Sequence, residues 1–177
     1  TAVTLNPNGG EANETEINVT YDDVYGDLPE PERTGYSFVG WFTNKAGGTE
    51  VTSKTTANIT ASDHTLYAQW KANNYTVFFD ENGGNTLSEA DKARIVKFDS
   101  LYRELPNVTR TGYTFLGWYN NKTGGTRVRS EDTVKTASNY TLYAQWEGST
   151  FTASFNPNGG SVDPQSMNVT YNSTYSS

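Results

Sequence analysis

Hydrophobic and polar residues alternate over short stretches of this chain, and the same stretches recur along it. Tyr75, Val77 and Phe79 fall on one face of an expected strand, and similar stretches begin at residues 1 and 151. Each is followed by Asn-Gly-Gly, which favours a tight turn. A second strand is expected after each turn, at 16–21, 93–98 and 166–171. Each copy of the pattern therefore opens with two strands joined by a turn.

Two further strands and one short helix complete the expected unit. The stretches "GYTFLGWY" (112–119) and "YTLYAQW" (140–146) predict strands, with a Gly-Gly-Thr turn between them. Asp22 and Asp99 are suitable N-caps for a short helix that ends before Pro29 or Pro106. The expected fold class is α+β and dominated by β-structure, with one short helix in each unit.

Internal repetition organises the whole chain. "RTGY" recurs after 77 residues, and "TLYAQW" at 65–70 returns unchanged at 141–146. We predict one unit at 1–70, a second at 75–146, and the first part of an incomplete third at 151–177. Cutting the repeat at 33–102 and 110–177 is the alternative, but the short connectors after each "AQW" favour the first division. The chain begins inside an expected strand, so we expect it to be a piece of a longer protein.

The repeated aromatic residues are candidates for a structural core. A unit of about 70 residues buries only about 60% of its unfolded surface, so each large aromatic side chain matters. The four tryptophans occupy equivalent positions, two in each full unit. The predicted core motif comprises Tyr36, Phe38, Trp41, Trp70, Tyr113, Phe115, Trp118 and Trp146.

Composition excludes several classes of function. The net charge is −7, from 13 Lys+Arg against 20 Asp+Glu, which is opposite to the basic footprint that nucleic acid requires. No apolar run approaches the roughly 18 residues needed to span a bilayer, so membrane insertion is not expected. Cysteine is absent, which removes disulfides and thiolate chemistry.

The hallmark segments resemble a known family. "YTVFFDENGG", "GYTFLGWYNNKTGGT" and "TLYAQW" are similar to the Listeria–Bacteroides repeat, the family to which the B-repeat of internalin B belongs. The resemblance implies a β-grasp, ubiquitin-like fold for each unit. It also implies tandem copies in large secreted or wall-attached proteins, mostly bacterial, and brings no shared catalytic residues.

Residues capable of chemistry do not form a repeated constellation. The only histidine, His64, is replaced by Tyr140 in the second unit, although an active site present in each unit would keep its general base. Acidic residues such as Asp80 and Glu81 lack calcium-loop spacing and are read as solvated turns. We therefore expect no enzyme activity, no metal and no cofactor. The candidates for stacking on a ligand are aromatics on the less buried sheet face: Phe42, Tyr67, Tyr119 and Tyr143.

Two functions follow from these observations. The first is a spacer or stalk segment of an extracellular or surface-attached bacterial protein of adhesin type. Its partners would be neighbouring repeats and other domains of the same long chain. The alternative is a binding module whose repeats each contact a host glycan or protein weakly and gain avidity from repetition.

Overall fold

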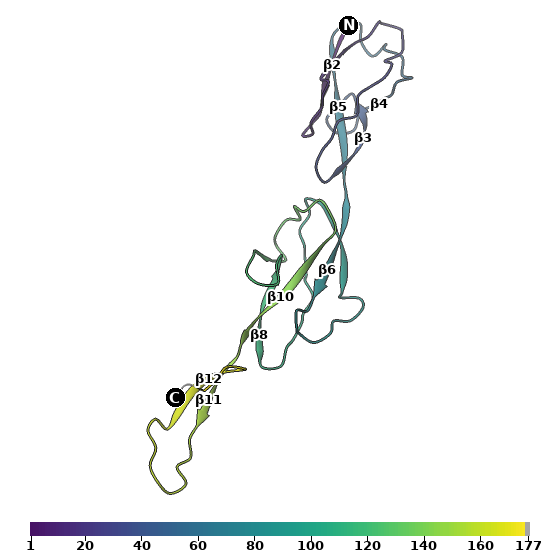
Figure 1. Cartoon of the computed structure of the whole chain (residues 1–177). Helices are drawn as coiled ribbons and strands as arrows, with labels where there is room; N and C mark the ends of the chain where they lie inside the picture. The colour runs from purple at the N-terminus through teal and green to yellow at the C-terminus, as the bar shows by residue number, and fades with distance from the viewer. Residues whose placement is uncertain (176–177) are drawn as a thin grey trace. The chain divides into compact units, whose positions relative to one another are not determined.

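The computed structural model describes residues 1–175 and forms three β-sheets over them (Figure 1). The strands are β1 (Ala2–Asn6), β2 (Glu16–Asn18), β3 (Tyr36–Phe42), β4 (Glu50–Val51), β5 (His64–Ala72), β6 (Asn74–Asp80), β7 (Ala93–Lys97), β8 (Tyr113–Tyr119), β9 (Arg127–Val128), β10 (Tyr140–Gly148), β11 (Thr150–Ser154) and β12 (Ser166–Thr170).

The first two sheets share one topology. Their strand orders are β2-β1-β5-β3-β4 and β7-β6-β10-β8-β9, and Figure 1 shows β6, β10 and β8 side by side. At the centre of each sheet lies a parallel pair, β1 with β5 and β6 with β10. The closing "TLYAQW" strand of each copy therefore lies between its opening strand and its Gly-Trp strand, and joins the two ends of the repeat.

The predicted α+β fold class, with a β-grasp unit that contains a short helix, is wrong. The described residues contain no helix, and the units are all-β. Asp22 and Asp99 have φ angles of 66° and 61°, in the left-handed region rather than the extended conformation of an N-cap. The predicted caps therefore sit at turns instead of helix starts.

Long-range hydrogen bonds explain why the helix does not form. The backbone N–H groups of Tyr25 and Gly26 donate to the carbonyl oxygens of Thr55 and Ser53. The second copy repeats this pattern, because the N–H of Tyr102 donates to the carbonyl of Asp132. These N–H groups donate to carbonyl oxygens about 30 residues away in the sequence, so they are not free for hydrogen bonds within a helix. The segment is therefore held as an extended connection over the sheet.

A tryptophan lies at the centre of each core. Trp41 is 1% exposed and Trp118 is 2% exposed. Each indole N–H donates to a proline carbonyl oxygen, Trp41 to Pro29 at 2.8 Å and Trp118 to Pro106 at 2.9 Å. Since a buried polar group without a partner is costly, this bond fixes the extended segment over the ring. The core of the first copy contains Val3, Leu5, Val19, Tyr25, Trp41, Val51, Ala57, Leu66 and Ala68.

The described chain forms two compact units. The first comprises Thr1–Tyr75 together with Lys97–Ser100 and Val134–Ser138, and the second comprises the remaining segments. Two short segments of the second sequence copy therefore belong to the compact unit of the first copy. The boundaries expected from the repeats, at 1–70, 75–146 and 151–177, stay a prediction, and the last two residues of that third range lie outside the described residues.

The third copy is a two-stranded hairpin of β11 and β12. None of its described residues is buried. Phe155 is 40% exposed, whereas Phe79, its equivalent in the second copy, is 5% exposed. The difference follows from topology, because residues 1–175 include no closing strand that pairs with β11.

Trp118→Ala should unfold the second sheet at lower denaturant concentration. Removal of this buried ring leaves a cavity and an unused proline carbonyl, and should cost about 3–5 kcal/mol of unfolding free energy. Urea unfolding followed by far-ultraviolet circular dichroism measures the loss. Tyr119→Ala is the matched control, because Tyr119 lies on the other sheet face and should cost clearly less. Equal losses for the two variants would contradict the core position of Trp118.

Candidate functional site

The four candidate ligand-stacking aromatics form two equivalent cross-strand pairs. Phe42 lies opposite Tyr67 in the first sheet, and Tyr119 lies opposite Tyr143 in the second. Because side chains alternate along a strand, both pairs lie on the face opposite the core tryptophan. All four side chains are partly buried. The structure thus places the two residues of each pair directly opposite each other, where cross-strand side chains are neighbours.

A lysine lies near each pair. The Lys45 ammonium is 5.9 Å from the centre of the Tyr67 ring, and the Lys122 ammonium is 5.5 Å from that of Tyr143. Lys122 also lies 3.7 Å from a carboxylate oxygen of Asp80, an exposed ion pair. These contacts are long and solvent-facing, so each contributes little to stability. They leave a small aromatic and charged surface at the same position in both copies.

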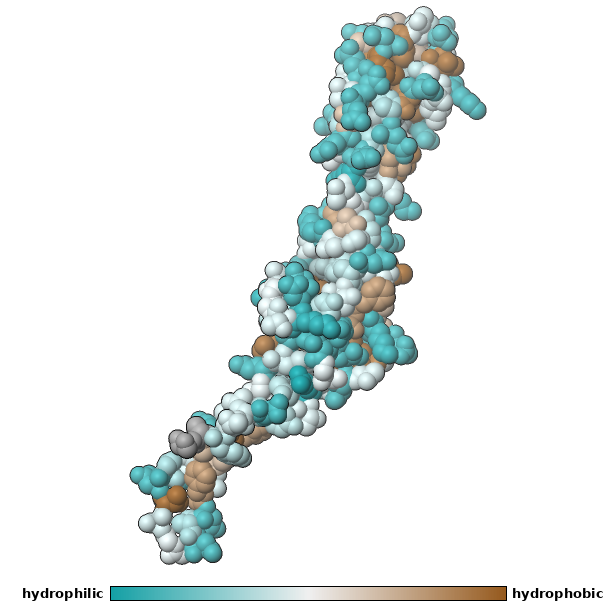
Figure 2. Space-filling view, in the orientation of Figure 1, coloured by the Kyte–Doolittle hydropathy of each residue, from teal (hydrophilic) through white to brown (hydrophobic). Residues whose placement is uncertain are grey.

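The rest of the surface is not organised around these pairs. On the face shown in Figure 2, hydrophobic residues occur as small separate patches among hydrophilic ones. Single exposed hydrophobic residues are ordinary in folded proteins, whereas large contiguous patches mark binding surfaces. The face in view therefore shows no extended apolar platform.

The predicted core-motif residues take two kinds of position. Trp41 and Trp118 are almost fully buried, whereas the other six are partly buried: Tyr36, Phe38, Trp70, Tyr113, Phe115 and Trp146. Phe38 contacts the rings of Trp41 and Trp70 edge-on, at centroid distances of 5.7 and 5.6 Å. Phe115 makes the equivalent contacts in the second copy. The phenylalanine and the two tryptophans of the motif thus form one aromatic cluster in each copy.

The outer tryptophans and the Asn-Gly-Gly turn are tied together. The indole N–H of Trp70 donates to the carbonyl of Pro7 at 2.9 Å, and that of Trp146 donates to the carbonyl of Glu81 at 3.0 Å. The glutamine before each tryptophan also bridges to a turn, since Gln69 donates to the carbonyl oxygens of Asn44 and Gly47. The tryptophan and glutamine at the end of each closing strand therefore position the turns of the repeat.

Tyr36 and Tyr113 lie at a sharp bend that we call the Gly-Tyr corner, formed by Arg33–Tyr36 in the first copy and Arg110–Tyr113 in the second. The Arg33 guanidinium lies 3.9 Å from the centre of the Tyr36 ring, and that of Arg110 lies 3.8 Å from that of Tyr113. Such stacking orients both side chains. The corner thereby presents a glycine beside a fixed tyrosine.

In the first compact unit, an aromatic ring covers the glycine of this corner. Gly35 has a φ of 79°, and a side chain added there would overlap the ring of Phe98. Phe98 is 7% exposed and meets Tyr36 edge-on, with ring centres 5.7 Å apart. The backbone closes the contact, because Asn73 donates to the carbonyl of Gly35 and accepts from the N–H of Phe98, both at 2.9 Å. Glycine is required here for both its φ angle and its lack of a side chain.

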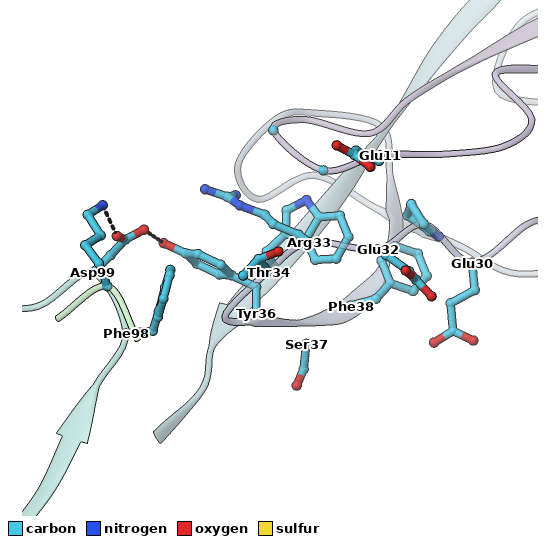
Figure 3. Close-up of a pocket in the computed structure, with 15 residues that line it drawn as sticks. Glu11, Glu30, Glu32, Arg33, Thr34, Tyr36, Ser37, Phe38, Phe98 and Asp99 are labelled. Carbon is cyan, nitrogen blue, oxygen red and sulfur yellow. Dashed lines mark hydrogen bonds and ion pairs between the residues drawn. The ribbon is translucent and has the colours of Figure 1, made fainter. Parts of the chain in front are cut away.

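Polar groups surround this contact in the first unit (Figure 3). The hydroxyl of Tyr36 donates to one carboxylate oxygen of Asp99, and Lys135 binds the other oxygen. The hydrogen bond from Lys135, followed by that from Tyr36, lowers the pKa of Asp99 below its ordinary value. The hydrogen bond to Asp99 raises the pKa of Tyr36. Beside these groups lies an open groove of about 930 Å³, lined in part by Glu11, Glu30 and Glu32.

The second compact unit contains the same contact. A side chain added to Gly112 would overlap the ring of Tyr171, and Tyr171 meets Tyr113 edge-on at 5.4 Å. Ser149 bridges the backbone, donating to the carbonyl of Gly112 at 2.9 Å and accepting from the N–H of Tyr171 at 2.8 Å. Phe98 and Tyr171 follow the second strand of their respective copies. The ring-on-glycine contact is therefore a repeated feature of the chain.

His64 is engaged through both ring nitrogens. The Tyr25 hydroxyl lies 2.7 Å from its Nε2, and its Nδ1 is 3.1 Å from the carbonyl oxygen of Ser62. In the second copy, the equivalent pair is Tyr102 and Tyr140, whose hydroxyls are hydrogen-bonded to each other. Burial is the main cause that raises the pKa of Tyr140, and the Tyr102 hydroxyl adds to it. The side chain at the His64 position is thus hydrogen-bonded to a tyrosine hydroxyl in both copies.

Residues 1–175 contain neither a metal-binding cluster nor a membrane-spanning helix. No group of three or more His, Cys, Asp or Glu side chains is placed to hold a metal ion. No helix among these residues is long and apolar enough to cross a membrane.

Comparison with known proteins assigns the family. The model of the Listeria-Bacteroides repeat domain matches the chain twice, over residues 2–69 and 75–145. The chain belongs to the Listeria–Bacteroides repeat family. The predicted resemblance is confirmed by these matches, which include both Gly-Tyr corners and the first part of each closing strand.

Relatives contain this repeat within longer proteins. The chain is 38% identical over 148 residues to Internalin H of Listeria monocytogenes, an alignment that covers 84% of this chain and 25% of Internalin H. It is 35% identical over 159 residues to a "Putative Gly-rich membrane protein" of Evansella cellulosilytica, covering 90% of this chain and 18% of that protein. The chain thus spans a quarter or less of these relatives.

The ring-on-glycine contact was not predicted from the sequence. The available signal was the recurrence of an aromatic residue after each second strand, at Tyr21, Phe98 and Tyr171. Sequence reasoning placed these residues at the ends of strands and gave them no partner. The partner of Phe98 and of Tyr171 is a glycine in the preceding copy, which no local pattern indicates.

Alkaline pH should destabilise the second sheet through Tyr102 and Tyr140. Their pKa values are raised in the folded protein, so this contribution to stability is present below the unfolded value of about 10 and is lost as pH rises through the folded values. Urea unfolding of the parent chain should show a large loss of unfolding free energy between pH 8 and pH 11. Tyr140→Phe should lose less unfolding free energy between the two pH values, because it removes a phenol whose pKa is raised. An unchanged loss in Tyr140→Phe would contradict the assignment.

Proposed function

We propose that this chain is a non-catalytic spacer segment of a bacterial surface protein, in which tandem repeats hold other domains of the same long polypeptide away from the cell. The observation that carries the proposal is the ring-on-glycine contact. It occurs at both Gly-Tyr corners of the chain, with Phe98 on Gly35 and Tyr171 on Gly112. A contact that recurs with the repeat is suited to a tandem array that holds other domains at a distance.

The use of the aromatic residues also supports a spacer. The hallmark tryptophans bind carbonyl oxygens of their own copy, and Tyr36 and Tyr113 contact the rings of Phe98 and Tyr171. Residues that could have formed a binding platform are therefore occupied in building the fold. The relatives support the setting, because one is an internalin and another is described as a membrane protein. An extracellular, surface-attached location and an adhesin-type parent protein belong to this proposal.

Short connections give the spacer its mechanism. β5 ends at Ala72 and β6 begins at Asn74, so a single residue separates the two strands. One residue spans at most about 3.6 Å of chain. With the aromatic ring seated on the preceding corner, we propose that each copy has little freedom to bend against its neighbour, and that reach grows with copy number.

A second candidate function is weak ligand binding by the open-face aromatic pairs. It is favoured by one observation, the equivalent placement of Tyr67 with Lys45 and of Tyr143 with Lys122. An aromatic face beside an ammonium group is suited to stacking on a sugar ring that carries an acidic group. Repetition would then supply avidity.

Distance measurement by double electron–electron resonance tests the spacer. The chain has no cysteine, so spin labels can be placed only at the exposed positions Lys54→Cys and Glu104→Cys. We expect a narrow distance distribution that broadens when Phe98→Ala empties the first corner. Tyr171→Ala is the matched control, because it empties the other corner and should leave this distribution unchanged.

Two results would contradict the proposal. One is a parent distribution as broad as that of Phe98→Ala, with circular dichroism showing that both chains are folded. The other is binding of the parent chain to immobilised acidic glycans that is abolished by a Tyr67→Ala/Tyr143→Ala double variant. The second result would support the binding module instead.

A further inference from the structure

The loop that carries the aromatic ring has the same backbone in all three copies. Asp22, Asp99 and Asn172, which follow the ring, have φ angles of 66°, 61° and 58°. The N–H two residues after the ring donates to the carbonyl of the residue before it at 3.1 Å in each copy, as in the bond from Asp23 to Thr20. The loop is therefore built the same way wherever the ring occurs.

Hydrogen bonds to the rest of the copy hold this loop in place. Asp22 donates to the carbonyl of Ala57 at 3.2 Å, and Asp99 donates to that of Val134 at 2.9 Å. The return bonds also match, from Ala57 to Asp23 at 2.7 Å and from Val134 to Ser100 at 2.8 Å. The first copy thus presents its ring on a loop as ordered as that of the second.

Within residues 1–175, the ring of the first copy has no counterpart to the glycine partner of the other two. Phe98 covers Gly35 and Tyr171 covers Gly112, so both Gly-Tyr corners of this chain are filled. Tyr21 is 49% exposed and makes no aromatic contact within residues 1–175. A single exposed tyrosine is ordinary. Tyr21 is different, because its two equivalents each cover a glycine and it covers none within residues 1–175.

We infer that Tyr21 and Asp22 form a docking surface for the Gly-Tyr corner of a further copy of this repeat. The ring of Tyr21 takes the place over the corner glycine that Phe98 takes over Gly35. The carboxylate of Asp22 accepts the hydroxyl of the corner tyrosine, as Asp99 accepts that of Tyr36. The surface selects a corner because only a glycine allows the ring to approach the backbone, and because the tyrosine hydroxyl matches an acceptor. This inference rests on the proposed spacer function and names the partner of its first copy.

The test adds a copy of residues 1–74 directly ahead of Thr1 in the full chain. The added corner then stands to Tyr21 as the first corner stands to Phe98. Protons of a glycine under an aromatic ring are shielded, so each filled corner should give one upfield-shifted glycine Hα resonance. We expect two such resonances in the parent chain and three in the extended chain. In the extended chain, Tyr21→Leu in the original first copy, not in the added one, should remove the third resonance alone.

Controls separate this inference from the spacer proposal. Tyr171→Leu in the extended chain should remove one resonance, assigned to Gly112, and leave the third in place. A third resonance that is absent from the folded extended chain, or that survives Tyr21→Leu, would overturn the inference. The spin-label distance between positions 54 and 104 does not involve Tyr21, so the spacer proposal can stand when this inference fails.

Discussion

A glycine that has no side chain and a left-handed backbone receives an aromatic ring at two points of this chain, and the organisation of the molecule depends on that contact. It requires glycine at the corner, an aromatic residue after the second strand, and one bridging residue whose backbone binds both. Phe98, Asn73 and Gly35 meet these requirements in the first compact unit. As a result, the first unit includes short segments from the second sequence copy. The first compact unit thus extends beyond the first sequence copy, although each five-stranded sheet is built from a single copy.

Inside each copy, the tryptophans impose a second constraint. A ring as large as that of Trp41 or Trp118 can be buried only if its N–H finds an acceptor, and the proline carbonyl supplies one. That bond draws the segment after the second strand across the sheet and closes the core. The candidate stacking aromatics lie on the opposite face, paired with each other. The core aromatics thus lie on one face of each sheet and the cross-strand pairs lie on the other. This separation explains why few aromatic residues of the chain gather on its surface.

Local patterns allowed the strands and the family to be predicted, and long-range bonds account for what was missed. Alternation over 75–79 and the "TLYAQW" strand follow from side-chain direction along a strand, so β6 and β10 occupy the expected stretches. The helix expected between Asp22 and Pro29 was wrong because capping is a local signal, whereas the N–H of Tyr25 donates to the carbonyl of Thr55, far along the chain. The contact at the corner could not be predicted for the same reason, since Tyr36 and Asp99 are 63 residues apart in sequence. No spacing rule links a glycine to a ring at that distance.

The most direct test of this account compares two glycine substitutions in the first copy. Gly35 and Gly47 have φ angles of 79° and 66°, so alanine at either position costs about 1–2 kcal/mol from the left-handed backbone. Only at Gly35 would the added methyl group overlap a ring, whereas nothing lies within 4 Å of the same position on Gly47. Urea unfolding should show that Gly35→Ala lowers the unfolding free energy by about 1–3 kcal/mol more than Gly47→Ala does, the usual cost of overpacking. Equal losses would show that Phe98 is not seated on Gly35 in solution, and would contradict the account.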